Sequence, residues 1–250
     1  MTSTNVRSVR RAFDILEVFA RLRRPLSLKE LTGELDCPSS SLADLLKTMS
    51  QIGCLSFDNK TKTYLPTTRL AALGDWVNDV ILPSRNPYEA LGELREEIGE
   101  TILLGTPNDL EIQYLFVLEG PHGAHYEQKP NGRRPLVKSA VGWIVLSQSN
   151  DDAIDRVWRR SIASGLIVRK ELPFETLRDR IEFCRRNGYV TARDSLNPEA
   201  AVVAMSLPGP YGGRQLAIGI GGQADRIENN AAHIAALLRD RAARLAGVAA

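Results

Sequence analysis

Residues 6–68 most restrict the fold, because three helical patterns there are followed by a change to strand periodicity. Apolar residues recur at helical spacing from Ser8 to Arg21, which predicts a first amphipathic helix. Ser27-Leu-Lys-Glu30 is a Ser-x-x-Glu capping box and predicts the start of a second helix. The turn Asp36-Cys-Pro38 precedes Ser39-Ser-Ser41, which opens a third helix. Short helices joined by such a turn form a helix-turn-helix.

The period of the apolar residues changes to two behind the third helix. Cys54–Phe57 and Thr63–Pro66 are expected to be strands, joined by the polar turn Asp58–Lys62. A hairpin directly behind a helix-turn-helix is a wing. Lys60 and Lys62 near its tip suit contacts with phosphate groups.

The charge of the chain is concentrated at the same end. The whole chain has a net charge of +2, but residues 1–74 carry eleven basic against seven acidic side chains. A net charge of +4 on this part predicts that a polyanion binds there, and the helix-turn-helix indicates duplex DNA. The residues predicted to contact DNA are Arg7, Arg10, Arg11, Ser27, Ser39, Ser40, Ser41, Asp44, Lys47, Lys60 and Lys62.

The outer face of the third helix is unusual for a DNA reader, because Lys47 is its only cation. Asp44 would repel phosphate groups or accept a hydrogen bond from the amino group of a cytosine. Ser40 and Ser41 can donate to phosphate at the start of the helix. We therefore expect most non-specific affinity to come from the first helix and the wing.

Composition excludes several other classes of protein. No run approaches the roughly 20 apolar residues that a membrane helix needs, and the first residues contain no apolar signal region. Cys37, Cys54 and Cys184 are too few for a disulfide framework, which predicts free thiols and a cytoplasmic protein.

The second half predicts a mixed domain behind a linker. Two prolines in Ile81–Pro87 interrupt any helix there, so we expect a DNA-binding domain at 1–68, a linker helix at 69–87 and a further domain at 88–250. The strands fall in neighbouring pairs with helices at the ends, which favours an α+β fold with an antiparallel sheet. The predicted strands are 101–107, 111–118, 124–129, 190–193, 201–207 and 215–220, and the predicted helices are 88–98, 140–148, 151–160, 174–186 and 227–245.

Catalytic and metal motifs are weak, so neither an enzyme nor a cofactor is expected. The chain has no Gly-x-Ser-x-Gly elbow and no phosphate-binding Gly-rich loop. Gly219–Ala224 resembles a dinucleotide fingerprint, but one remaining helix cannot complete a βαβ unit. His122 and His125, with Glu127 nearby, could ligate zinc, but no further cysteine or histidine lies close by. An exposed loop is therefore the favoured interpretation.

Several segments, in order along the chain, resemble the IclR (isocitrate lyase regulator) family of bacterial transcription factors. The N-terminal segments are 7–16, 28–31, 38–46 and 52–55. The C-terminal ones are Leu94–Thr101 with its Gly-Glu-Thr, Gly132–Leu136 with Ser139–Gly142, and Arg185–Tyr189. The chain departs from the family pattern at Gly142-Trp143, where Gly-Lys is usual, and at Asp44, where a basic residue is frequent.

The resemblance implies a winged helix-turn-helix followed by a GAF-like effector-binding domain. It also implies a homodimer or homotetramer that binds palindromic promoter DNA in response to a small molecule. The interpretation is a ligand-responsive transcriptional regulator, a repressor. The alternative is a sensor or enzyme whose helix-turn-helix no longer binds DNA. Subunit contacts are expected on the first helix and the linker helix, near Leu70, Leu73, Trp76 and Val77.

The resemblance also places an effector cavity. Its positions in this sequence are Ala140, Val141, Gly142, Ala192, Val202, Gly219 and Gly221. All are apolar or glycine, and such walls cannot compensate the desolvation of a small acid. The sequence therefore predicts an apolar or aromatic effector, with Gly219 and Gly221 opening volume on one face of a strand.

Overall fold

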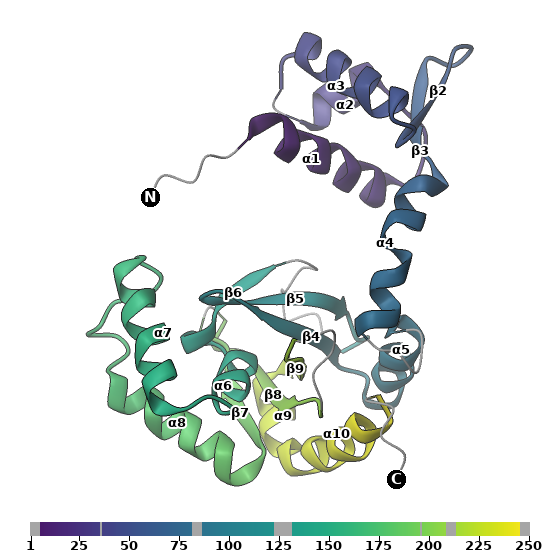
Figure 1. Cartoon of the computed structure of the whole chain (residues 1–250). Coiled ribbons are helices and arrows are strands. Elements are labelled where there is room, and N and C mark those ends of the chain that lie inside the picture. The colour runs from purple at the N-terminus through teal and green to yellow at the C-terminus, as the bar shows by residue number, and fades with distance from the viewer. Residues whose placement is uncertain are drawn as a thin grey trace. The chain divides into compact units, whose positions relative to one another are not determined.

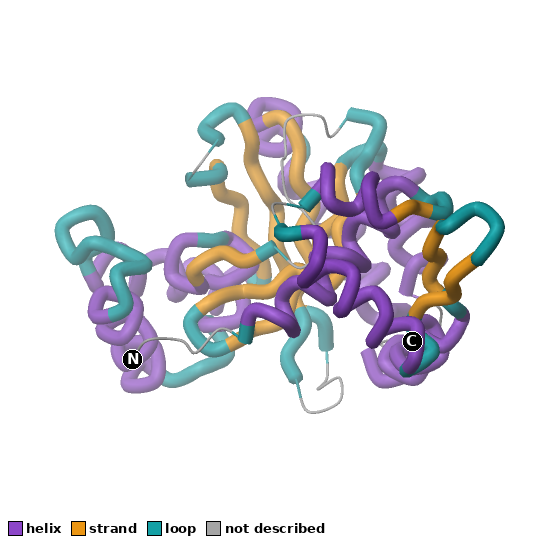
Figure 2. The backbone as a smooth tube through the Cα atoms, turned by 90° about the horizontal axis from the view of Figure 1, so that it is seen from above, coloured by secondary structure: helices purple, strands orange, loops and turns teal. Residues whose placement is uncertain are grey.

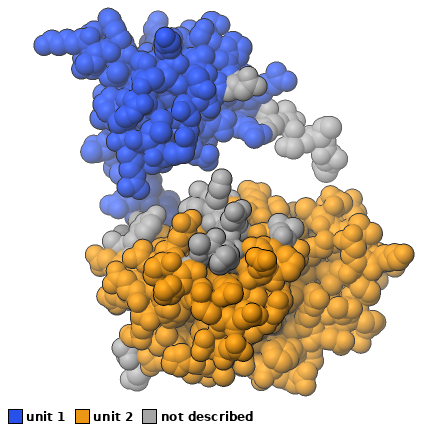
Figure 3. Space-filling view, turned by 180° about the vertical axis from the view of Figure 1, so that it is seen from behind, with its two compact units in different colours: residues 1–77 blue, residues 78–250 orange. Residues whose placement is uncertain are grey.

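The computed structural model describes residues 6–35, 37–81, 87–122, 132–195, 197–208 and 214–245. The chain forms two compact units, Met1–Val77 and Asn78–Ala250 (Figure 3). The division falls inside the predicted linker, within helix α4 (Thr68–Ile81). Each unit has its own hydrophobic core.

The N-terminal unit is a winged helix-turn-helix, as predicted (Figure 1). Its helices α1, α2 and α3 pack around side chains that are almost fully buried, among them Ile15, Leu31 and Leu46. A two-residue strand, β1, pairs with β3 and completes a sheet of order β1-β3-β2. Two residues are too short to show a periodicity, so the sequence does not predict this strand. The bounds are α1 Arg7–Leu22, β1 Leu26–Ser27, α2 Leu28–Glu34, α3 Ser39–Gln51, β2 Leu55–Asp58 and β3 Thr63–Pro66.

The predicted capping box forms at the start of α2. The hydroxyl of Ser27 accepts the backbone N–H of Glu30, and the Glu30 carboxylate accepts the backbone N–H of Ser27 at 2.8 Å. That backbone N–H, the guanidinium of Arg24 and the Ser27 hydroxyl together lower the pKa of Glu30 from 4.5 to about 2.

Acid is therefore expected to weaken the N-terminal unit through Glu30. Because the pKa is lower in the folded chain, the carboxylate stabilises the fold above about pH 4.5 and loses this effect as the pH falls towards 2. Glu30→Gln should lower the free energy of unfolding near pH 7 and flatten its dependence between pH 5 and 2. Urea titrations at several pH values measure this, and an unchanged pH dependence would contradict it.

The C-terminal unit is built on a six-stranded antiparallel sheet of order β6-β5-β4-β9-β8-β7 (Figure 2). The α+β prediction is thus confirmed. The strands are β4 Thr101–Asn108, β5 Glu111–Leu118, β6 Arg133–Pro135, β7 Tyr189–Arg193, β8 Ala200–Ser206 and β9 Ala217–Gln223. The helices are α5 Pro87–Ile98, the 3-10 turn η1 Leu136–Lys138, α6 Ala140–Leu146, α7 Asp151–Ala163, α8 Phe174–Asn187, α9 Ala224–Asn229 and α10 Ala231–Leu245.

Helices cover both faces of this sheet, and alternate residues of each strand define the two cores. On β4, Leu103 packs with α6, α7 and α8, whereas Ile102 and Leu104 pack with α5, α9 and α10 (Figure 1). Every residue of α6 is buried, so this short apolar helix fills one face of the sheet. The sheet therefore positions the start of α6 against the strands that carry the predicted effector residues.

One predicted element lies outside the described residues, and another differs from the structure. The strand expected at 124–129 lies outside the described residues, and the described edge strand is β6, which pairs with β5. The single helix expected from Ile227 begins earlier and is divided into α9 and α10. Asn230 interrupts it, with a φ of −105° that is not helical.

Candidate nucleic-acid interface and effector cavity

The first turns of α1 carry three cations that the fold itself does not require. Arg7 and Arg10 are exposed, Arg11 is half-buried, and among the described residues none of them has an ion-pair partner. Arg21, at the other end of α1, is in contrast paired with Glu34 at 2.5 Å. Cations at a helix N-terminus oppose the helix dipole, so these arginines do not stabilise α1. They are available to an anionic ligand.

The start of α3 presents donors to the outside. Ser39, Ser40 and Ser41 are exposed, and Pro38 at the N-cap supplies no side-chain hydrogen bond to the first turn. Backbone N–H groups left without a cap, together with exposed hydroxyls, form a site suited to phosphate. Asp44 and Lys47 are also exposed, on the turns that follow.

Ser27 is placed differently from the other residues predicted to contact DNA. Its hydroxyl donates to the Glu30 carboxylate at 2.7 Å and accepts the backbone N–H of Glu30. Its single O–H donor is used inside the capping box, so Ser27 orders α2.

The wing tip is ordered although both its lysines are exposed. The Asp58 carboxylate accepts the backbone N–H of Lys60 at 2.8 Å, and this hydrogen bond lowers the pKa of Asp58. Lys62 adopts a left-handed φ of 55°, and its ammonium group lies 5.9 Å from the ring centroid of Phe57. These contacts hold the hairpin turn and leave the ammonium group of Lys60 in solvent.

A small cavity lies in the C-terminal unit between η1, α6 and the strands β5, β7 and β8. Its volume is about 20 Å³, close to that of a single water molecule. Ala140, Val141, Ala192 and Val202, four of the seven predicted effector residues, lie on its walls.

The three predicted glycines are not among the residues that line this cavity. A Cβ on Gly219 would lie 3.1 Å from side-chain atoms of both Val141 and Val202, so valine methyl groups already fill the space beside it. Gly142 packs directly against the backbone of Leu136. Gly221 pairs in register with Val202 and Thr101. Gly219 therefore opens no volume here, contrary to expectation, and Gly221 is not among the residues that line this cavity.

The walls also carry polar side chains that sequence reasoning missed. Arg134 of β6 contacts Asp194, which follows β7, at 3.5 Å, and their side chains are 16% and 9% exposed. The expectation of entirely apolar walls is thus corrected. Gly132–Leu136 resembles a segment of the family, but its sequence alone does not indicate that Arg134 faces a cavity. The missed lining residues are Tyr114, Arg134, Lys138, Ser139, Arg193, Asp194 and Ser195.

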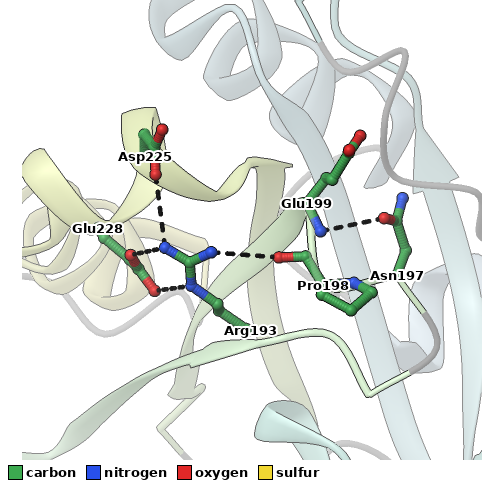
Figure 4. A network of polar contacts seen from close by, with 6 residues as sticks. All are labelled: Arg193, Asn197, Pro198, Glu199, Asp225 and Glu228. Carbon is green, nitrogen blue, oxygen red and sulfur yellow. Dashed lines mark hydrogen bonds and ion pairs between the residues drawn. The ribbon is translucent and has the colours of Figure 1, made fainter.

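A polar network fixes the end of β7 beside the cavity (Figure 4). Arg193 donates to the two carboxylate oxygens of Glu228 at 2.8 and 2.7 Å, and to Asp225 at 3.4 Å. Glu228 above all, and Asp225 less strongly, raise the pKa of Arg193. A further bond to the carbonyl of Pro198 at 3.4 Å connects Arg193 to the segment that leads into β8. One side chain thus joins β7, α9 and that segment.

Other candidate chemistries find no support in the described residues. These contain no group of three or more metal-ligating side chains, and His125 and Glu127 lie outside them. Gly219–Gln223 lies within β9 itself, which is antiparallel to both its neighbours and so belongs to no βαβ unit. Burial raises the pKa of the Cys184 thiol to about 12. Across the described part of the chain, no helix combines the length and the apolar character needed to cross a membrane.

The two units define a class of protein, the transcriptional regulators that join a helix-turn-helix domain to an effector domain. The family model of the IclR helix-turn-helix domain matches residues 8–59, and that of the bacterial transcriptional regulator IclR C-terminal domain matches residues 85–246. These models cover most of the sequence, so the chain belongs to the IclR family. The families are regulators rather than enzymes, as predicted.

Curated relatives support the same assignment. The HTH-type transcriptional regulator KdgR of Dickeya chrysanthemi is 22% identical over 204 residues, which are 82% of this chain and 66% of that protein, just under two thirds. The HTH-type transcriptional regulator XynR of Escherichia coli K12 is 23% identical over 203 residues, 81% of this chain and 80% of that protein.

Solved structures agree in fold. The IclR of Thermotoga maritima has a TM-score of 0.69 at 17% identity and covers 97% of this chain and 98% of its own. An IclR homolog of Microbacterium hydrocarbonoxydans, crystallised with 4-hydroxybenzoate, has a TM-score of 0.66 at 18% identity and covers 96% of this chain and 98% of its own.

Proposed function

We propose that this protein is a ligand-responsive repressor that binds promoter DNA as a homodimer or a dimer of dimers and senses an apolar or aromatic metabolite. The observation that carries the DNA-binding part is the set of exposed cations on α1 and the wing that have no ion-pair partner among the described residues. They accompany the open first turn of α3 in the same compact unit. Phosphate contacts from such cations supply most non-specific affinity for DNA.

DNA binding is expected to be sensitive to salt, with part of that sensitivity due to the wing. Each phosphate contact contributes about 0.9 to the slope of log K against log salt. Replacing both Lys60 and Lys62 with alanine should therefore reduce the slope by roughly two per subunit. Fluorescence anisotropy with DNA from upstream of the gene, at several salt concentrations, measures it.

Arg21→Ala is the matched control, because it removes a cation that Glu34 already neutralises. Its slope should stay close to that of the unmodified chain. If the double lysine variant also keeps its slope, the wing does not contact DNA. If the unmodified chain does not bind the DNA at all, the proposed function is wrong.

Large exposed apolar side chains on α1 and α4 favour a second copy of the chain as a partner. Val9 and Phe13 on α1 are 56% and 63% exposed, and Leu73 and Trp76 on α4 are 59% and 63% exposed. Two half-sites about 34 Å apart on palindromic DNA also require a protein with two-fold symmetry. Of the residues predicted for this interface, Leu70 is half-buried and Val77 is exposed.

A double variant of Phe13 and Trp76, each changed to glutamate, is expected to be monomeric at micromolar concentration. Burial of one large apolar side chain stabilises by about 1.5–3 kcal/mol. Losing two should raise the Kd of the dimer at least about 100-fold. Light scattering measures the mass. Val168→Glu, at a 56% exposed position in the other unit, is the control and should stay dimeric. A dimeric double variant would place the interface elsewhere.

The effector part of the proposal rests on the cavity. Ala140, Val141, Ala192 and Val202 give it an apolar side suited to an apolar or aromatic body. The Microbacterium homolog crystallised with 4-hydroxybenzoate has the same fold, which supports an aromatic effector here. A volume of about 20 Å³ is too small for such a compound, so binding requires the cavity to widen.

A further inference from the structure

The ion pair in the cavity wall joins the two opposite edges of the sheet. Arg134 belongs to edge strand β6, and Asp194 directly follows edge strand β7. In a flat six-stranded sheet these edges would be roughly 24 Å apart. The Nη2–Oδ2 distance of 3.5 Å is possible only because the sheet curls, so the pair spans the opening of the curl beside α6.

Asp194 is held in this position from its own side of the cavity. Its backbone N–H donates to the carbonyl of Ala200 at 2.8 Å, and its Oδ1 accepts the backbone N–H of Asn197 at 3.3 Å. The neighbouring Arg193 anchors the same segment through Pro198 (Figure 4). Contacts within the protein therefore hold the Asp194 carboxylate beside the Arg134 guanidinium, and no ligand is needed for this position.

The stability of the fold does not account for this pair. A buried ion pair gains little over apolar side chains of similar size, because both charges lose their hydration. Four apolar residues already line the same cavity. A guanidinium placed among them is suited to binding a carboxylate in two parallel hydrogen bonds.

We propose that the Arg134–Asp194 pair closes the effector cavity, and that the effector opens it with a carboxylate that takes the place of Asp194 on Arg134. This inference rests on the proposed function. Exchange of one carboxylate for another keeps a negative charge beside the largely buried guanidinium, whereas an uncharged ligand would not replace the charge of Asp194. The exchange separates β6 from the end of β7 and widens the space beside Ala140 and Val141.

Calorimetry with benzoate and its uncharged analogue benzamide tests the exchange on the full chain. Asp194→Asn removes the internal competitor and should bind benzoate at least tenfold more tightly than the unmodified chain. Its affinity for benzamide should change less than threefold. Asp109→Asn is the matched control, because it breaks the exposed Arg160–Asp109 pair, and its benzoate affinity should not change.

A second variant separates the loss of charge from a loss of structure. Arg134→Gln combined with Asp194→Asn replaces the ion pair by an uncharged pair, and should bind benzoate no better than benzamide. Circular dichroism confirms that each variant is folded. The proposal is overturned if Asp194→Asn binds benzoate within threefold of the unmodified chain or not at all, or if the double variant keeps the gain. The DNA titration of the unmodified chain reports separately on the proposed function.

Discussion

Replacing Gly142 with alanine is expected to destabilise the C-terminal unit by about 3 kcal/mol. A Cβ at this position would lie 2.1 Å from the carbonyl oxygen of Leu136 and 2.7 Å from its Cα. These are backbone atoms of η1, which cannot rotate away as a side chain can, so α6 and η1 would have to separate. Urea unfolding of the full chain, followed by the fluorescence of buried Trp143 and Trp158, measures the loss.

Gly92→Ala is the matched control for this prediction. Gly92 lies in the interior of α5, and a Cβ there would meet no atom within 4 Å. Alanine is favoured over glycine in a helix by up to about 1 kcal/mol, so this variant should be equally stable or more stable. If the two variants lost the same stability, the close approach of α6 to η1 would not be the cause.

Arg226→Met is expected to reduce the stability of the same unit by about 3 kcal/mol. The Arg226 guanidinium donates to the two carboxylate oxygens of Glu100 at 2.8 and 3.3 Å, and to the carbonyl of His122 at 2.7 Å. The Glu100 side chain is only 7% exposed, so methionine at 226 leaves a buried carboxylate without its cation. The same urea titration measures the effect.

An exposed ion pair provides the comparison. Arg160 and Asp109 lie 2.8 Å apart with side chains that are 59% and 63% exposed. Solvent screens such a pair, so Arg160→Met should change stability by less than about 1 kcal/mol. Equal losses in the two methionine variants would mean that burial of Glu100 is not decisive.

The N-terminal unit could be predicted almost completely, because its signals are local. The capping box of Ser27 and Glu30, the turn at Pro38 and the change of period after α3 each involve residues within a few positions of one another. Strand β1 is the exception, since it exists only through its pairing with β3.

The cavity could be predicted only in part, because its walls meet through tertiary structure. Arg134 and Asp194 are 60 residues apart and belong to opposite edges of the sheet, so no spacing along the chain connects them. The expectation for Gly219 failed for a related reason, because its effect depends on which side chains pack beside it. A glycine on a strand can open a cavity or receive a neighbour, and here the methyl groups of Val141 and Val202 occupy the space. Only the packing distinguishes the two outcomes.

The strand order of the C-terminal unit has a consequence for synthesis on the ribosome. The central neighbours β4 and β9 come from residues 101–108 and 217–223, so the middle of the sheet cannot form until nearly the whole chain has emerged. The core of the N-terminal unit is formed by residues within the first 77. That unit can fold while the rest is still being translated. A product truncated before β9 would therefore carry a complete winged helix-turn-helix and no sheet able to enclose an effector.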